Sequence, residues 1–332
     1  MAVEKVHHAI GSKFTLQGKP SLAGHIQIAR FDHWIKNVFV LPGILGALSF
    51  NPEKATFDLF WTMCIGLLSV GLVASSNYVI NEILDAPCDR LHPVKRNRPV
   101  PSGRVSVSLA YAQWILLMVA GIGLASLLSF PFLLTMLFLW VMGCVYNAPP
   151  IRSKDSPYVD VLSEAINNPI RLLAGWFIVS PEAVVPASLL LSYWMVGCYF
   201  MAIKRFSEFR DLGNPKLASD YRKSFGFYTQ ERLLVSILFY GSTAMLFFGA
   251  FLIRYRLELV LSFPLIAMVM STYLGMSFKK GSAAQAPEKL YRERFLVVCV
   301  ISCAVVMGGL FFIDIPFLYQ VFSPTLSTGF RS

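Results

Sequence analysis

The sequence predicts an all-α, polytopic membrane protein with nine transmembrane helices. Charged residues make up only 14% of its 332 residues, against about 25% in a typical soluble domain. Apolar residues make up 55%, and the mean hydropathy is +0.58. A soluble globule of this length could not bury so much apolar surface, and a disordered chain has the opposite composition. Only a protein that exposes much of its surface to lipid fits these values.

The chain contains nine apolar stretches, and a helix needs about 20 residues to cross the hydrocarbon layer. The first stretch is short, and 22–36 could extend it as an interfacial helix. We expect residues 1–21 to be a flexible polar N-terminus, 22–313 the membrane domain and 314–332 a short non-cytoplasmic tail. The predicted spans are 38–50, 58–80, 107–129, 131–147, 159–179, 186–203, 233–253, 257–277 and 295–313.

The distribution of basic residues predicts the topology. With nine spans, one set of connecting segments contains 24 Lys and Arg residues and the opposite set contains 4. The positive-inside rule then places the N-terminus and the long polar loops in the cytoplasm. The loops on the opposite side are short, so we expect the active site to face the cytoplasm. Topology also accounts for the net charge of +10 without a nucleic-acid partner.

A polar stripe closes the second predicted span. Asn77, Asn81, Asp85 and Asp89 recur every four residues and would share one face of a helix. Carboxylate and amide oxygens suit Mg²⁺, which usually shares its site with substrate phosphates. The alternative is a helix end with solvated acids next to basic residues that follow the positive-inside rule. The following segment supplies candidate phosphate ligands, namely Arg90, His92, Lys95, Arg96, Arg98 and Arg104.

Charged residues also close the sixth predicted span. Lys204 and Arg205 are followed by Glu208 and Asp211, which are three residues apart and could share a face. In one interpretation the two cations bind phosphate directly. In the other, Lys204 and Glu208 form an ordinary salt bridge at i,i+4.

The fifth predicted span contains charged residues in an otherwise apolar stretch. Asp160, Glu164 and Arg171 have offsets of four and seven residues, which place them on one face. Charges at membrane depth usually face a cavity or each other. Arg171 would therefore line the substrate cavity and Asp160 its cytoplasmic rim, with Tyr146 of the fourth span nearby. The alternative is an internal Glu164–Arg171 pair that cancels charge.

The stripe carries a resemblance to a known family. Asn81-Glu82-x-x-Asp85-x-x-x-Asp89, followed by Lys95 and Arg98, resembles the N-D-x-x-D-x-x-x-D hallmark of the UbiA superfamily of intramembrane prenyltransferases. The chain departs from this pattern at Glu82, which replaces an Asp. The resemblance implies nine helices around a central cavity that opens to the cytoplasm, and Mg²⁺ held by Asn81, Asp85 and Asp89.

Shorter segments resemble the polyprenyl-phosphate phosphoribosyltransferases of that superfamily. These are Arg30-x-x-x-Trp34-x-Lys36-Asn37, the Ile-Arg-x-x-Ala-Gly stretch around Arg171, and Lys204-Arg205-x-x-Glu208. Most superfamily members carry a second set of aspartates where Lys204 and Arg205 stand. The resemblance implies catalytic roles for Asp85, Asp89, Lys204 and Glu208. It implies that substrate is bound by Lys36, Asn37, Lys95, Arg98, Tyr146, Asp160, Arg171 and Arg205.

Three functions remain open at this stage. The first is Mg²⁺-dependent transfer of a phosphoribosyl group from phosphoribosyl pyrophosphate to a polyprenyl phosphate. The second is prenyl transfer from a polyprenyl diphosphate to an aromatic acceptor such as 4-hydroxybenzoate. The third is transport, which usually shows polar breaks near the middle of matched helices. In the first two, the partners are a polyprenyl lipid, a phosphorylated donor and the bilayer of an inner or plasma membrane.

Overall fold

The computed structural model describes residues 18–90, 95–213, 219, 222–285 and 287–323. Most of the predicted flexible N-terminus, and His92 among the predicted phosphate ligands, lie outside these residues. Within them the chain forms helices and no strand, so the all-α prediction is confirmed. The α-helices are α2 (Leu22–Ile28), α3 (Leu41–Phe50), α4 (Phe57–Asp89), α5 (Val107–Ala125), α6 (Phe130–Asn147), α7 (Val159–Ala165), α8 (Asn167–Val179), α9 (Ala187–Leu212), α11 (Gln230–Tyr255), α12 (Phe263–Met276), α13 (Arg294–Leu310) and α14 (Pro316–Val321).

Among the described residues, six helical segments are long and apolar enough to cross a membrane, which makes this an integral membrane protein. They are α4, α5, α6, α9, α11 and the segment 257–276, in which the 3₁₀ helix η6 (Leu257–Ser262) runs into α12. The other three predicted spans are helical but shorter or interrupted. Nine membrane-crossing helices and an opening to the cytoplasm therefore remain predictions.

Besides 257–277, two of the predicted spans are not single α-helices. In the first predicted span, 38–50, the 3₁₀ helix η1 (Phe31–Val40) leads directly into α3. The fifth is interrupted between α7 and α8, around Ile166. The predicted interfacial helix is also divided, into α2 and the beginning of η1. Hydropathy reports that a segment is apolar, but it does not report local breaks of this kind.

The α3 and α8 helices pack backbone against backbone. A side chain at Gly43 would collide with the carbonyl oxygen of Leu172, and a side chain at Gly175 would collide with that of Val40. Glycine at both positions therefore permits the close approach. As a result, η1 is held against the part of α8 that carries Arg171.

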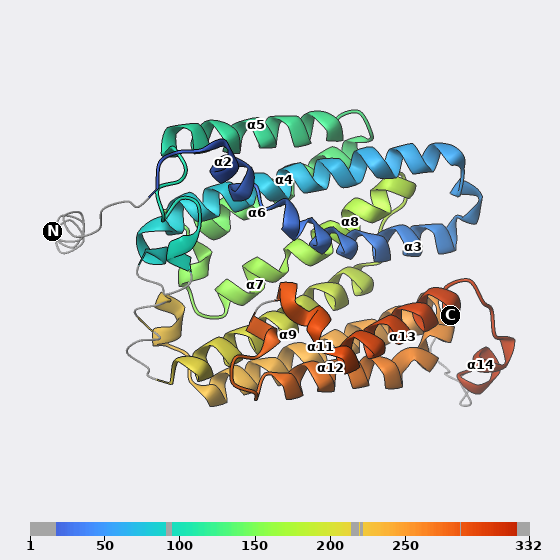
Figure 1. The fold of residues 1–332 in the computed structure, drawn as a ribbon. Coiled ribbons are helices and arrows are strands. Elements are labelled where there is room, and N and C mark those ends of the chain that lie inside the picture. Colours follow the sequence, from blue (N-terminus) through green and yellow to red (C-terminus); the bar gives the residue numbers. More distant parts are fainter. Residues whose placement is uncertain (1–17, 91–94, 214–218, 220–221, 286, 324–332) are drawn as a thin grey trace.

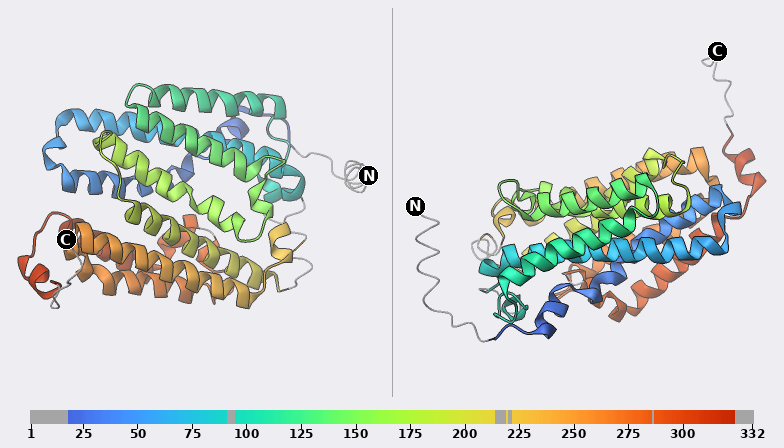
Figure 2. Two further views of the ribbon diagram at one scale, coloured as in Figure 1. Left: turned by 180° about the vertical axis from the view of Figure 1, so that it is seen from behind. Right: turned by 90° about the horizontal axis from the view of Figure 1, so that it is seen from above.

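The helices form two groups with separate hydrophobic cores (Figure 1). The first core lies among η1, α3, α4, α5, α6 and α8, and the second lies among α7, α9, α11, α12 and α13. The short helices α2 and α14 lie at opposite ends of the bundle (Figures 1 and 2). The charged residues predicted from the sequence lie mainly at the end of α4, in the first group, and at the end of α9, in the second, and Lys95 is within electrostatic reach of carboxylates on both helices.

Candidate active site at the ends of α4 and α9

The acidic stripe lies on the last turns of α4, as predicted. The Oδ1 atom of Asp85 accepts hydrogen bonds from Arg152 Nη2 at 2.9 Å and Lys154 Nζ at 2.6 Å. The Oδ2 atom of Asp89 accepts one from Arg98 Nη1 at 2.7 Å. The α4 helix continues past Pro87 to Asp89, so the stripe is helical to its end. The acids of α4 are thus paired with basic residues from two different loops.

An amide bridge connects the stripe to α6. Asn81 Nδ2 donates to Asn147 Oδ1 at 2.5 Å and to Asp85 Oδ2 at 3.3 Å. The Asn147 Oδ1 atom also accepts a hydrogen bond from Lys154 Nζ at 2.9 Å. Burial lowers the pKa of Lys154, and the nearby Asp85 carboxylate opposes that shift. Lys154 lies in the 3₁₀ helix η4 (Ser153–Asp155), which the bridge fixes against the end of α4.

Glu82, the departure from the family pattern, has a structural role. Its side chain is 1% exposed and accepts hydrogen bonds from Arg30 Nη2 at 2.8 Å and from the Val100 amide at 3.1 Å. About two turns before Glu82 on α4, Ser75 Oγ accepts a hydrogen bond from Trp34 Nε1 at 2.9 Å. The N-terminal segment that carries Lys36 is therefore fixed along α4. Glu82 connects this segment to the basic loop and does not join the acidic stripe.

Arg205, at the end of α9, lies among three carboxylates. It contacts Glu164 at 2.6 Å, Asp160 at 3.1 Å and Glu208 at 3.1 Å, and only 1% of its side chain is exposed. We expected Arg205 to bind a substrate phosphate, but its guanidinium is already bound to carboxylates from α7 and α9. The salt bridge between Lys204 and Glu208, which was the alternative interpretation, is absent among the residues that the structure describes.

Asp160 is buried at the centre of a hydrogen-bond network and does not lie at a cavity rim. Its carboxylate is fully buried and accepts hydrogen bonds from Arg205, Arg222, Ser224 and Tyr228. This corrects the prediction that Asp160 binds substrate at the cytoplasmic rim. Arg222 was not among the predicted site residues. A basic residue on a loop predicted to be cytoplasmic is expected from topology alone, and no sequence spacing connects Arg222 to Asp160.

Lys36 and Lys204 form no ion pair within the described residues, although the carboxylates of Glu208 and Glu164 act on Lys204 more strongly than Lys36 does. Neither ammonium has a hydrogen-bond or ion-pair partner within the described part of the chain, although Lys36 lies 5.8 Å from the centre of the Tyr78 ring. The charge of Lys36 acts on Lys204, so the two lie within electrostatic reach of each other. Both are half-buried, and Asn37 beside Lys36 is buried. The two groups of helices thus bring two lysines together.

Lys95 lies between the two clusters. It opens the 3₁₀ helix η3 (Lys95–Asn97) in the loop after α4. Burial lowers its pKa, and Glu208 of α9 and Asp89 of α4 both oppose that shift. Lys95 is therefore within electrostatic reach of carboxylates from both helices. The basic loop after α4 covers the junction between the clusters.

Glu164 and Arg171 do not form the pair that we considered. Glu164 accepts hydrogen bonds from Arg205 and, at 2.8 Å, from the hydroxyl of Tyr146. Arg171 Nη1 donates instead to the carbonyl of Asn167 at 3.3 Å. Tyr146 is thus placed next to the charged cluster as predicted, but its hydroxyl is bound to Glu164.

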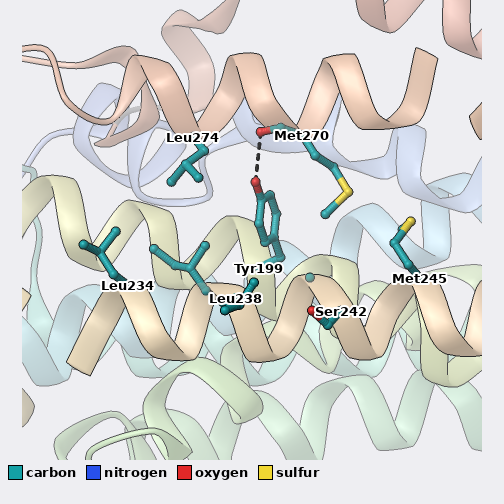
Figure 3. Close-up of a pocket in the computed structure, with 9 residues that line it drawn as sticks. Tyr199, Leu234, Leu238, Ser242, Met245, Met270 and Leu274 are labelled. Atoms are coloured by element: carbon teal, nitrogen blue, oxygen red, sulfur yellow. Dashed lines mark hydrogen bonds between the residues drawn. The ribbon is translucent and has the colours of Figure 1, made fainter. Parts of the chain in front are cut away.

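A cavity of about 420 Å³ lies between α9, α11 and α12 (Figure 3). Its lining is apolar, and the hydroxyl of Tyr199 donates across it to the carbonyl of Met270 at 2.9 Å. Tyr199 and Lys204 are five residues apart and so lie about 140° apart around α9. The cavity therefore opens on a different face of α9 from the charged site, and its chemistry suits hydrocarbon and not phosphate.

The residues of α4 fit a metal that shares its coordination with substrate. Within the described residues there is no group of three or more His, Cys, Asp or Glu side chains that could hold an ion. Asp85 and Asp89 use one oxygen each in their ion pairs, and Asn81 Oδ1 adds a further oxygen ligand on the same face. Two carboxylates and an amide are too few to hold Mg²⁺ alone, but they suffice when phosphate oxygens and water complete the site.

Comparisons with known proteins identify the family of this chain. The profile of the UbiA prenyltransferase family matches residues 39–300. The chain is 30% identical over 221 residues to the decaprenyl-phosphate phosphoribosyltransferase of Mycolicibacterium smegmatis and 31% identical over 225 residues to that of Corynebacterium glutamicum. These alignments cover 65% and 63% of this chain, and 65% and 61% of those relatives.

Solved structures share the fold. A UbiA homolog from Archaeoglobus fulgidus, bound to DMAPP and Mg²⁺, is similar with a TM-score of 0.65 at 22% identity, covering 86% of this chain and 98% of that one. The apo structure of a UbiA homolog from Aeropyrum pernix has a TM-score of 0.61 at 19% identity, covering 83% and 98%. Because the family profile spans most of the sequence and the bundle has the same architecture, this chain belongs to the UbiA prenyltransferase family.

Proposed function

We propose that this protein is a Mg²⁺-dependent membrane transferase that moves the 5-phosphoribosyl group from phosphoribosyl pyrophosphate to a polyprenyl phosphate. The observation that carries the proposal is that Lys36 and Lys204 form no ion pair within the described residues and lie within electrostatic reach of each other, with the carboxylates of Glu208 and Glu164 also near Lys204. Such a donor has two anionic ends. The acids of α4 offer a metal site for one end, and the two lysines offer cations for the other. Relatives at 30–31% identity named decaprenyl-phosphate phosphoribosyltransferase support this assignment.

The acidic residues of α4 would form the metal site. Asp85 and Asp89, with Asn81, would hold Mg²⁺, and the ion would stabilise the negative charge of the departing pyrophosphate. Arg98, Arg152 and Lys154 now contact the two carboxylates. In the complex they would turn toward the phosphate oxygens.

Lys204 and Lys36 would bind the 5-phosphate, while Glu208 and Arg205 hold the end of α9 in place. Asn37, next to Lys36, would orient that segment. Because Asp160 and Arg205 bind each other, we assign both to positioning and not to substrate contact.

The reaction requires no strong general base. An oxygen of the lipid phosphate forms a bond to C1 of the ribose while the bond from C1 to the pyrophosphate oxygen breaks. The pyrophosphate leaves with the bonding electron pair. The attacking phosphate is already ionised near neutral pH, so no proton has to be removed. The site accordingly needs cations and correct placement more than it needs an acid–base pair.

Prenyl transfer to an aromatic acceptor is the second candidate. Prenyl transfer as such, though not the aromatic acceptor, is supported by the match to a digeranylgeranylglyceryl phosphate synthase of Saccharolobus solfataricus, 31% identical over 133 residues, which cover 40% of this chain. Purified protein with Mg²⁺ separates the two candidates. One reaction contains labelled phosphoribosyl pyrophosphate and a polyprenyl phosphate, and the other contains a polyprenyl diphosphate and 4-hydroxybenzoate. We expect product in the first reaction alone. Product in the second alone would favour the second candidate.

We further propose that the site faces the cytoplasm. Native cysteines offer a test, because Cys88 and Cys64 are both exposed but lie near opposite ends of α4. A membrane-impermeant maleimide should label Cys88 in inverted vesicles and not in intact cells. Cys64, within the lipid-facing part of the helix, serves as the control that should remain unlabelled in both. Labelling of Cys88 from outside intact cells would contradict the proposal and place the site on the opposite side of the membrane.

A further inference from the structure

Arg171 is a buried cation without a counterion. It lies in α8, one turn past the break between α7 and α8, and is 8% exposed. Its Nε atom has no hydrogen-bond partner, and no carboxylate within the described residues lies within ion-pair distance of it. Its one hydrogen bond runs from Nη1 to the carbonyl of Asn167 at 3.3 Å. A charge at membrane depth is costly, so an unpaired one points to a ligand that supplies the missing negative charge.

The side chain of Arg171 points back toward the charged site. Side chains on a helix tilt toward its N-terminus, and α8 begins at Asn167, next to the end of α7 that carries Glu164. The hydrogen bond to the Asn167 carbonyl has this direction. Arg171 lies four residues after Asn167, which corresponds to about 6 Å along α8 from the break that follows α7. Arg171 therefore lies beyond the break from Glu164, further along this span from its predicted cytoplasmic end.

Two other elements surround Arg171. Tyr193 of α9 lies within electrostatic reach of its guanidinium, and the Tyr193 hydroxyl donates to the Phe39 carbonyl of η1 at 3.2 Å. Tyr193 and Lys204 are eleven residues apart, which places them on nearly the same face of α9 and about 16 Å apart along it. The elements that carry Lys36 and Lys204 at the mouth of the site thus also surround Arg171 at a deeper level.

We propose that Arg171 binds the phosphate of the lipid acceptor and so selects an anionic polyisoprenoid phosphate over an uncharged acceptor. This inference rests on the proposed function and deepens it. A lipid enters from the bilayer, so its headgroup reaches the site from the deeper side, while the water-soluble donor enters from the mouth. The planar guanidinium can hold two phosphate oxygens at once. The third oxygen is left to attack C1 of the ribose, and the pyrophosphate leaves with the bonding electron pair toward Asp85 and Asp89.

A purely structural arginine is the alternative to exclude. In that case Arg171 serves to bind the free carbonyl at the helix break. Arg171→Gln separates the two roles, because glutamine retains a donor for the Asn167 carbonyl but removes the positive charge. Arg171→Lys is the matched variant, since it retains the charge but cannot form two parallel hydrogen bonds. Lys204→Gln, on α9, is the control for a charge that we assign to the donor.

The experiment measures lipid binding without the donor. The full-length chain is reconstituted in nanodiscs, and the affinities for decaprenyl phosphate and for uncharged decaprenol are obtained from thermal shifts. We expect Arg171→Gln to weaken binding of decaprenyl phosphate by about 10-fold or more, and Arg171→Lys to weaken it less. Decaprenol binding should not change. In turnover assays, Arg171→Gln should raise the KM for the lipid phosphate and alter the donor KM by less than about 3-fold.

The outcomes that would overturn the inference are distinct from those that would overturn the proposed function. Equal affinity of wild type and Arg171→Gln for decaprenyl phosphate would overturn it. Equal loss of phosphate and alcohol binding, together with a lower melting temperature, would assign Arg171 to the helix break. If wild type binds decaprenyl phosphate through Arg171 but forms no phosphoribosyl lipid, the proposed reaction is wrong and the acceptor site stands.

Discussion

The two charged clusters of this molecule are built differently, although both lie at a helix end. At the end of α4, Asp85 and its partner Arg152 are 22% and 21% exposed, and the basic partners come from loops. At the end of α9, Arg205 and Asp160 are 1% and 0% exposed and are bound to each other. The Asp85–Arg152 pair of the first cluster can exchange one partner for another because water and ligands reach it, although Asp89 and Lys154 beside it are only 8% and 6% exposed. The second cluster cannot do so without leaving a charge buried.

This difference suggests that the α4 cluster binds substrate and that the α9 cluster supports the fold. Exposed ion pairs contribute little to stability, so cations at α4 lose little free energy when they turn from a carboxylate to a phosphate. Breaking a buried pair leaves an uncompensated charge in a medium of low polarity. The α9 cluster therefore holds α7 and α9 together. Lys204 is next to Arg205 on this fixed helix end and lies within electrostatic reach of Lys36.

The largest expected effect is on folding, from loss of the buried cation. Arg205→Met removes the positive charge shared by Asp160, Glu164 and Glu208. The expected loss is about 3–5 kcal/mol in the free energy of unfolding. Melting of the purified protein in detergent measures it. Lys204→Met, on the same helix, is the matched control and should lose much less. Equal stability of the two variants would remove the distinction between scaffold and site.

The next effect concerns activity without loss of fold. Asp85→Ala and Asp89→Ala should each lower kcat/KM by about 100-fold or more, because the metal stabilises the leaving group. Removal of Mg²⁺ with EDTA should have the same effect. The side chain of Asp85 is 22% exposed and that of Asp89 is 8% exposed, so Asp85→Ala should change the free energy of unfolding by less than about 1 kcal/mol and Asp89→Ala by more. Activity that persists in EDTA, or in Asp85→Ala, would refute a metal site at α4.

A smaller effect should distinguish the two substrates. Lys204→Ala and Lys36→Ala each remove one charged contact to a phosphate, worth about 1.5–3 kcal/mol. The KM for phosphoribosyl pyrophosphate should rise by about 10- to 150-fold. Binding of the lipid should change far less, in contrast to Arg171→Gln. Equal weakening of both substrates would indicate that the lysines support the fold.

The smallest effect is a shift in pH dependence. Burial lowers the pKa of Lys95, so this ammonium loses its proton at a lower pH than an ordinary lysine as the pH rises. If Lys95 binds the donor, the donor KM should rise on the alkaline side before the usual lysine range is reached. Lys95→Arg, which stays charged, should move this rise to higher pH. The donor KM measured from about pH 7 to about pH 10 tests this, and identical profiles would exclude Lys95 from donor binding.

Much of the site follows from local spacing. The four-residue repeat Asn81, Asp85 and Asp89 is a property of one helix, so its common face could be predicted without any tertiary contact. The apolar runs likewise located the helices, because a lipid-facing segment must be apolar whatever its neighbours are. The contacts of Glu82, in contrast, could not be predicted from local spacing. Glu82 stands at a motif position, where it replaces an Asp, but its partners Arg30 and Val100 come from other segments of the chain.

By itself, then, the sequence determined the fold class, the family and the acidic stripe. Only the tertiary structure decided which charges pair. Arg205 rather than Lys204 is enclosed by carboxylates, Asp160 recruits Arg222, and Arg171 has no counterion within the described residues. The physical reason is that helical periodicity depends on neighbours in sequence, whereas the energy of an ion pair depends on burial and on groups from other helices. Those quantities exist only after the helices have packed.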